Sequence, residues 1–115
     1  MYIGRTVPFA NDYQRSIHFA AHKHEFGVAT EEDYERMADA FMAQAANANL
    51  YDGTCVTPRR DNGLCDRLRL DNISLWYGVA YGALTVRTLH KRKRKTITRA
   101  GGPRAFINAK CLEVR

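Results

Sequence analysis

The sequence predicts a single α+β domain in which two N-terminal helices pack on an antiparallel sheet of four or five strands. Apolar residues recur at helical spacing in the first half of the chain and alternate with polar ones in the second half. Asp, Asn and Gly residues separate the alternating stretches, as expected for short turns. Helices followed by a run of strands are typical of the α+β class, and 115 residues fit one compact domain.

The first helix is expected from near Tyr13 to His24, within a helical part that covers residues 13–50. Gly27 follows it and can serve as a C-terminal cap. Residues 1–12 contain a proline and little periodicity, and are expected to form a leader arm before this helix.

The second helix is expected to begin after Thr30. Thr30 and Asp33 fit a capping box, and the acids at 31–33 place negative charge at the positive end of the helix. Asp52–Gly53 is expected to end the helical part. An apolar stripe at 3.6-residue spacing, expected to lie in the core, consists of Tyr34, Met37, Ala38, Phe41, Met42 and Ala45.

The sheet is expected between residues 54 and 95. Leu68 and Leu70 alternate with charged residues, as in a half-buried strand. The segment 96–115 is a basic tail or a last strand, and the candidate strand is Phe106–Val114. Strands are expected over 54–60, 67–71, 75–81 and 83–93, and turns at 61–63, 71–72 and 82.

Positive charge is concentrated toward the C-terminus. The net charge is +6, and Arg87 to Arg104 includes eight Lys or Arg residues and no acid. Such a stripe attracts nucleic acid, and also acidic membrane surfaces or proteins. No segment resembles a membrane span or a signal peptide, so no membrane association is expected. Three cysteines without close pairing predict reduced thiols in a cytoplasmic protein: Cys55, Cys65 and Cys111.

Three histidines stand within seven residues, at positions 18, 22 and 24. His18 and His22 are four apart and share one face of a helix. Because histidine exchanges protons near neutral pH, the pair predicts acid–base catalysis. A zinc site completed by His24 or a cysteine is the alternative, although no Cys-x-x-Cys or His-Glu-x-x-His motif accompanies it. Glu25 is a candidate carboxylate of the site, but an exposed residue at the helix end is the favoured interpretation.

Several motifs occur in a fixed order along residues 17–90. The pattern His-Phe-x-x-His-x-x-Glu-Phe-Gly begins at His18. It is followed by Thr30, Tyr34 and Ala38, then by the segments 67–71, 77–79 and 82–88. In these motifs the chain resembles the barnase–EndoU–colicin–RelE-like nuclease superfamily, especially its polymorphic-toxin and phage-associated branches. In that superfamily a helix with a histidine pair packs on a four-stranded antiparallel sheet.

The resemblance implies a small, metal-independent and cofactor-free endoribonuclease of the toxin type. It implies cleavage of tRNA or other structured RNA, and a cognate immunity or antitoxin protein as partner. The protein would act in the cytoplasm, delivered as part of a larger toxin or encoded by a phage. By position, the superfamily's helix histidines and last-strand pair correspond to His18, His22, Arg87 and Thr88.

RNA carries its own nucleophile, the 2′-OH, so a base, an acid and donors to the phosphoryl oxygens are enough for cleavage. We expect His22 to transfer a proton with His18 as its partner or orienting neighbour, Arg87 to bind the phosphate, and Thr88 to donate a hydrogen bond to it. Lys91 or His90 is a candidate to add charge or to take over the second proton transfer. Adjacent strand residues point to opposite faces, so Arg87 and Thr88 act together only if a bulge intervenes. Otherwise Thr88 serves a site in the helix–sheet cleft, or Arg87 a site on the open sheet face.

Further contacts to the substrate are expected from basic and aromatic side chains. Trp76 alternates with Tyr77, so one of them faces the core and the other is free to stack on bases. The alternative function is a non-catalytic nucleic-acid-binding protein that uses the basic stripe of residues 87–104. An inactive domain that binds a protein partner is a further alternative. The expected substrate-binding residues are His24, Trp76, His90, Lys91 and Arg92.

Overall fold

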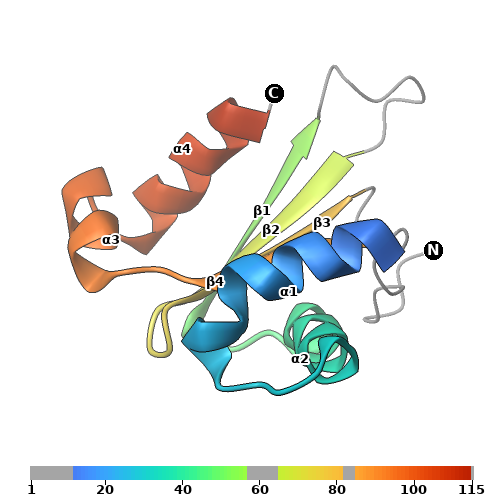
Figure 1. Cartoon of the computed structure of the whole chain (residues 1–115). Helices are drawn as coiled ribbons and strands as arrows, with labels where there is room; N and C mark the ends of the chain where they lie inside the picture. The colour runs from blue at the N-terminus through green and yellow to red at the C-terminus, as the bar shows by residue number, and fades with distance from the viewer. Residues whose placement is uncertain (1–11, 57–64, 82–84, 115) are drawn as a thin grey trace.

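The computed structural model describes residues 12–56, 65–81 and 85–114 (Figure 1). Its strands form one antiparallel sheet in the order β1-β2-β3-β4. The α+β class, with two helices before the strands, is therefore confirmed. The turns predicted at 61–63 and 82 and residues 1–11 of the predicted leader arm lie outside the described residues, while Asp12 already belongs to the first helix. The elements are α1 (Asp12–Phe26), α2 (Glu31–Ala43), β1 (Leu50–Val56), β2 (Cys65–Asp71), β3 (Trp76–Tyr81), β4 (Thr85–Lys91), α3 (Arg94–Ala100) and α4 (Pro103–Val114).

The ends of the first two helices follow from local capping. Gly27 adopts a φ of 65° after α1, a conformation that glycine takes without strain, and its amide donates to the Lys23 carbonyl. At the start of α2, the Thr30 hydroxyl accepts a hydrogen bond from the Asp33 amide at 3.1 Å. The predicted cap at Gly27 and the predicted start of the second helix after Thr30 are therefore confirmed.

The C-terminal boundary of the helical part differs from the prediction. α2 ends at Ala43, so Ala45 lies outside the helix and is exposed. Asp52 and Gly53 lie inside β1, where they pair with Arg69 and Leu68 of β2. Pairing across the sheet has outweighed the turn preference of the Asp-Gly pair.

The sheet lies between two helical layers, with α1 and α2 on one face and α3 and α4 on the other (Figure 1). The core under α1 and α2 contains Tyr34, Ala38, Phe41, Met42, Leu50, Ala80 and Leu89. The core under α3 and α4 contains Leu68, Leu70, Tyr77, Val79, Ile97, Phe106 and Ile107.

The prediction of a basic tail or last strand after residue 96 is wrong. The segment forms two helices, which Gly101 and Gly102 separate. Pro103 begins α4, a position that proline favours because no backbone N–H is needed there. Phe106 and Ile107 are fully buried against the sheet. This segment therefore covers one face of the sheet as helix α4 and does not add a fifth strand to its edge.

α2 approaches the sheet most closely at Gly78 of β3. A Cβ at this position would lie 2.6 Å from Sδ of Met42 and 3.1 Å from Cδ2 of Phe41. On the same face, the Trp76 ring packs between Phe26 and Phe41, with centroids 5.1 and 5.8 Å away. These contacts hold α1 and α2 firmly against β3, and α1 lies against the neighbouring β4.

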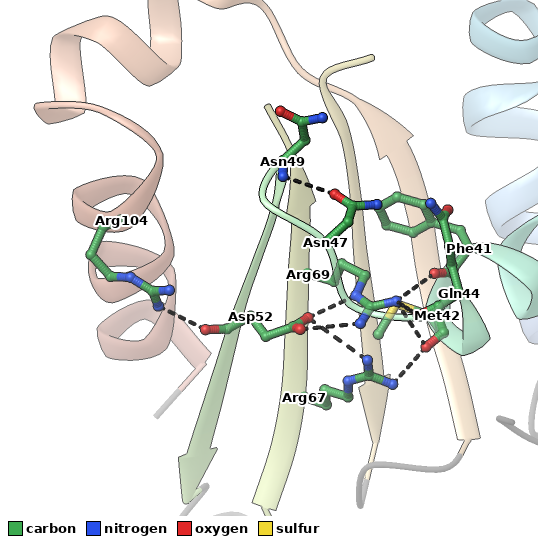
Figure 2. A network of polar contacts seen from close by, with 9 residues as sticks. All are labelled: Phe41, Met42, Gln44, Asn47, Asn49, Asp52, Arg67, Arg69 and Arg104. Carbon is green, nitrogen blue, oxygen red and sulfur yellow. Dashed lines mark hydrogen bonds and ion pairs between the residues drawn. The ribbon is translucent and has the colours of Figure 1, made fainter. Parts of the chain in front are cut away.

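A buried arginine from β2 caps the end of α2 (Figure 2). Arg69 is 2% exposed, and its Nη1 donates to the carbonyl oxygens of Phe41 and Gln44 at 3.0 and 2.6 Å. Its Nε and Nη2 donate to the two carboxylate oxygens of Asp52 at 2.7 and 3.1 Å. Carbonyls at a helix C-terminus lack partners within the helix and attract a cation. β2 is therefore buried on both faces, not half-buried as predicted.

Candidate active site

Histidines from α1 and β4 meet at the edge of the sheet. The ring centroid of His22 lies 4.8 Å from that of His90 and 6.4 Å from that of His18. The rings of His18 and His22 are stacked at 11°, as their spacing of one helical turn predicts. We call these three residues the histidine cluster. All three are half-buried, so the cluster has an edge that is open to solvent.

Glu25 connects His22 to β4. One carboxylate oxygen lies 2.6 Å from Nδ1 of His22, and the other accepts a hydrogen bond from the Lys91 amide at 2.6 Å. A carboxylate only accepts hydrogen bonds, so the Nδ1 of His22 carries a proton and Nε2 is the atom that can exchange one. The prediction that Glu25 is an exposed helix-end residue is wrong. The unpaired amide of an edge strand supplies a partner that sequence reasoning could not see.

Tyr34 of α2 holds β4 from the other face. Its hydroxyl donates to the Leu89 carbonyl at 2.6 Å and accepts from the Leu89 amide at 3.2 Å. Tyr34 and Leu89 are both fully buried. Tyr34 thus anchors the edge strand at Leu89, one residue before His90, and this contact fixes the position of the His90 imidazole.

His90 has an environment that keeps it uncharged. Its ring packs on Tyr77, with centroids 5.2 Å apart, on the face covered by α4. Burial lowers the pKa of His90 to about 4, and the charges of His22, Arg92 and Lys110 act in the same direction against the opposing effect of Glu25. His90 is therefore a neutral imidazole at physiological pH, able to accept a proton.

Two cationic side chains border the histidine cluster. The Arg92 guanidinium lies over the rings of Tyr77 and Phe106, 6.0 and 5.4 Å from their centroids, and its Nη1 is 3.5 Å from Nδ1 of His90. Lys110 of α4 lies over the same Phe106 ring at 5.5 Å. Arg92 was among the predicted substrate-binding residues. Lys110 was missed because its segment was not expected to fold back over the sheet.

The aromatic candidates for base stacking belong to the core. Trp76 packs with Phe26 and Phe41 under α1 and α2, so the prediction that Trp76 binds substrate is corrected. Tyr77 is only 4% exposed, between His90 and Phe106. Strand alternation placed the two rings on opposite faces, and helices cover both faces.

The other two predicted substrate-binding residues, His24 and Lys91, do not join the cluster with their side chains. His24 is exposed and follows His22 by two residues, about 200° around the helix, so it is on a different face from the cluster. Lys91 contributes its backbone amide to Glu25, while its side chain is exposed.

β4 contains the irregularity that the pair Arg87 and Thr88 requires. Thr88 pairs with Val79 and Val86 pairs with Ala80, so Arg87 is an extra residue in β4 at a register shift. The side chains of Arg87 and Thr88 lie outside the part of the chain that is described. Of the two locations considered for the site, the open sheet face does not exist as such, because α3 and α4 cover it. The cluster lies instead at the β4 edge, beside α1.

Comparison with models of known protein families, with curated proteins and with solved structures finds no match to this chain. Within the described ranges, no group of three or more His, Cys, Asp or Glu side chains is arranged to hold a metal ion. No helix in the same ranges has the length and apolar character needed to cross a membrane. The nuclease resemblance thus remains a prediction that rests on the sequence motifs.

Proposed function

We propose that this protein is a metal-independent endoribonuclease that cleaves tRNA or other structured RNA. The attacking group would be the 2′-OH, and the products a 2′,3′-cyclic phosphate and a 5′-hydroxyl. The contact between His22 and His90 is the observation that carries the proposal. It places two imidazoles with different environments side by side at one solvent-open edge.

His22 is assigned the central proton transfer. Glu25 holds its Nδ1 at 2.6 Å and is itself fixed by the Lys91 amide, so the ring is oriented before substrate binds. Nε2 is then the atom that exchanges a proton with the substrate. His18, stacked on His22 one turn earlier, is assigned as its partner.

His90 is assigned as a second proton acceptor. Burial is the largest cause of its low pKa, and the charges of His22 when protonated, Arg92 and Lys110 lower the pKa further. A bound phosphate would offset the part due to those charges, and so would raise the pKa of His90 and make it a stronger base. Substrate binding and base strength are therefore linked at this site.

Positive charge for the phosphoryl group comes from Arg92 and Lys110, which flank the cluster. The superfamily resemblance adds Arg87 and Thr88 as donors to the phosphoryl oxygens. It also supports a toxin-type enzyme that acts in the cytoplasm and is neutralised by a cognate immunity or antitoxin protein.

The test is cleavage of total tRNA in excess chelator by wild type, His22→Ala and His24→Ala. Wild type and His24→Ala are expected to produce discrete fragments that end in cyclic phosphate. His22→Ala should be slower by about 100-fold or more, the usual contribution of a general acid or base. His24→Ala is the matched control because it removes an exposed imidazole from the same helix.

RNA affinity should hardly change in His22→Ala, because phosphate contacts come mainly from Arg and Lys. Equal cleavage by wild type and His22→Ala would refute the catalytic assignment. Intact RNA that stays bound to all three proteins would identify a non-catalytic nucleic-acid-binding protein instead.

A further inference from the structure

The basic run after β4 is sorted by the fold into inward and outward side chains. Arg92 points onto Tyr77 and Phe106, and its amide donates to the Leu75 carbonyl at 2.7 Å. Arg94 donates to the side-chain and backbone oxygens of Asn72. These two arginines attach the run to the rest of the domain, so it is not a free tail.

The flanking lysines point away from the core. Lys93 has extended backbone angles, φ −96° and ψ 141°, and continues the direction of β4. Side chains alternate along extended backbone, so Lys91 and Lys93 lie on the side opposite Arg92. Both are exposed.

Helix α3 follows Lys93 directly and carries two more exposed cations. Its one buried residue is Ile97, while Lys95 and Arg99 are exposed. Lys95 and Arg99 are four apart and share a helix face, and each is two residues, about 200°, from Ile97. The buried Ile97 thus directs both cations to solvent.

We propose that these four residues, Lys91, Lys93, Lys95 and Arg99, form a cationic surface that binds RNA phosphates beyond the point of cleavage. No ion pair within the described ranges neutralises any of the four, and residues 87–112 contain no acid. The surface begins beside the histidine cluster, because the Lys91 amide is bonded to the Glu25 that holds His22.

The geometry favours RNA over other polyanions. A membrane-surface helix needs an exposed apolar face, but Ile97 of α3 is buried. A stable protein interface has an apolar centre, and of the exposed large apolar residues in the described chain only Ile73 lies near this surface, next to the Asn72 that Arg94 contacts. Several exposed cations without a nearby acid in the sequence suit a phosphate backbone. The choice of RNA rests on the proposed ribonuclease function.

The experiment measures binding of a fully 2′-O-methylated RNA hairpin, which has no free 2′-OH and cannot be cleaved. Its affinity is measured by fluorescence anisotropy between 50 and 200 mM salt for wild type, for Lys95→Gln/Arg99→Gln and for a control. The control, Arg36→Gln/Ala40→Glu, changes two exposed positions of α2 and lowers the net charge by the same amount.

Each phosphate contact contributes about 0.7–0.9 to the slope of log affinity against log salt. Lys95→Gln/Arg99→Gln should therefore reduce the slope by about 1.4–1.8, and the fourfold rise in salt should weaken wild type about 10-fold more than this variant. The control should keep the wild-type slope. Equal salt slopes for both variants would overturn the proposed RNA-binding surface. Binding to phosphatidylserine vesicles without binding to the hairpin would also overturn it.

Cleavage of unmodified tRNA separates the two proposals. A reduced slope together with no cleavage by wild type would support the cationic surface and refute the ribonuclease. Cleavage that depends on His22, together with an unchanged slope, would support the ribonuclease and refute the surface.

Discussion

Replacing Tyr34 by phenylalanine is expected to lower the free energy of unfolding by about 2–4 kcal/mol. The change leaves the ring, which packs on Phe19 and Phe26 with centroids 6.3 and 6.1 Å away, and removes only the hydroxyl. That hydroxyl is the partner of both the carbonyl and the amide of Leu89, which is fully buried. Each buried backbone group left without a partner costs about 1–3 kcal/mol.

The assay is urea unfolding followed by circular dichroism, and the free energies of unfolding of wild type and variants are compared with one shared m-value. For a domain of this size, the expected loss corresponds to a fall in melting temperature of roughly 6–20 °C. Tyr51→Phe is the matched control, because the half-buried Tyr51 hydroxyl makes no hydrogen bond to the described residues, and we expect a change within about 0.5 kcal/mol. A Tyr34→Phe variant as stable as Tyr51→Phe would refute the anchoring of β4.

Two further predictions concern buried charge. Because the pKa of His90 is lowered from 6.5 to about 4, the unfolded chain binds a proton between these values that the folded chain does not. The free energy of unfolding should therefore fall as pH is lowered from 6.5 to 4, by about 3 kcal/mol at most. The His90→Gln variant should lack this contribution to the pH dependence. Parallel pH profiles for wild type and His90→Gln would contradict it. Arg69→Met removes the donor to the carbonyls of Phe41 and Gln44, while Asp52 keeps Arg67 at 3.8 Å, and the loss of the two carbonyl partners should cost about 2–4 kcal/mol in urea unfolding. Arg36→Met breaks only an exposed ion pair with Asp33, so a loss as large as that of Arg69→Met would argue against the capping role of Arg69.

The elements that were predicted well are those specified by neighbouring residues. Thr30 and Gly27 mark helix ends through contacts made within four residues, and the apolar stripe from Tyr34 to Met42 has helical spacing whatever it packs on. The strands β2 and β3 likewise follow from local alternation. Errors occur where a distant segment decides, as at Asp52–Gly53, which pairs with β2 instead of turning.

The candidate site shows the same division. The pairing of His18 with His22 follows from helical spacing and was predicted from the sequence. The contact of His22 with His90 depends on α1 lying against β4, which Gly78, Trp76 and Tyr34 bring about through packing. No local pattern encodes that distance.

The sequence by itself determined the α+β class, the two N-terminal helices, the histidine pair and the basic run, because each depends on spacing between near neighbours. Tertiary structure alone decided that His90 and Glu25 join the pair, and that Lys110 lies over the ring of Phe106 beside Arg92. It also decided that the basic run presents only part of its charge to solvent. Those outcomes depend on which faces of the sheet the helices cover, and burial of apolar surface across the whole chain settles that choice.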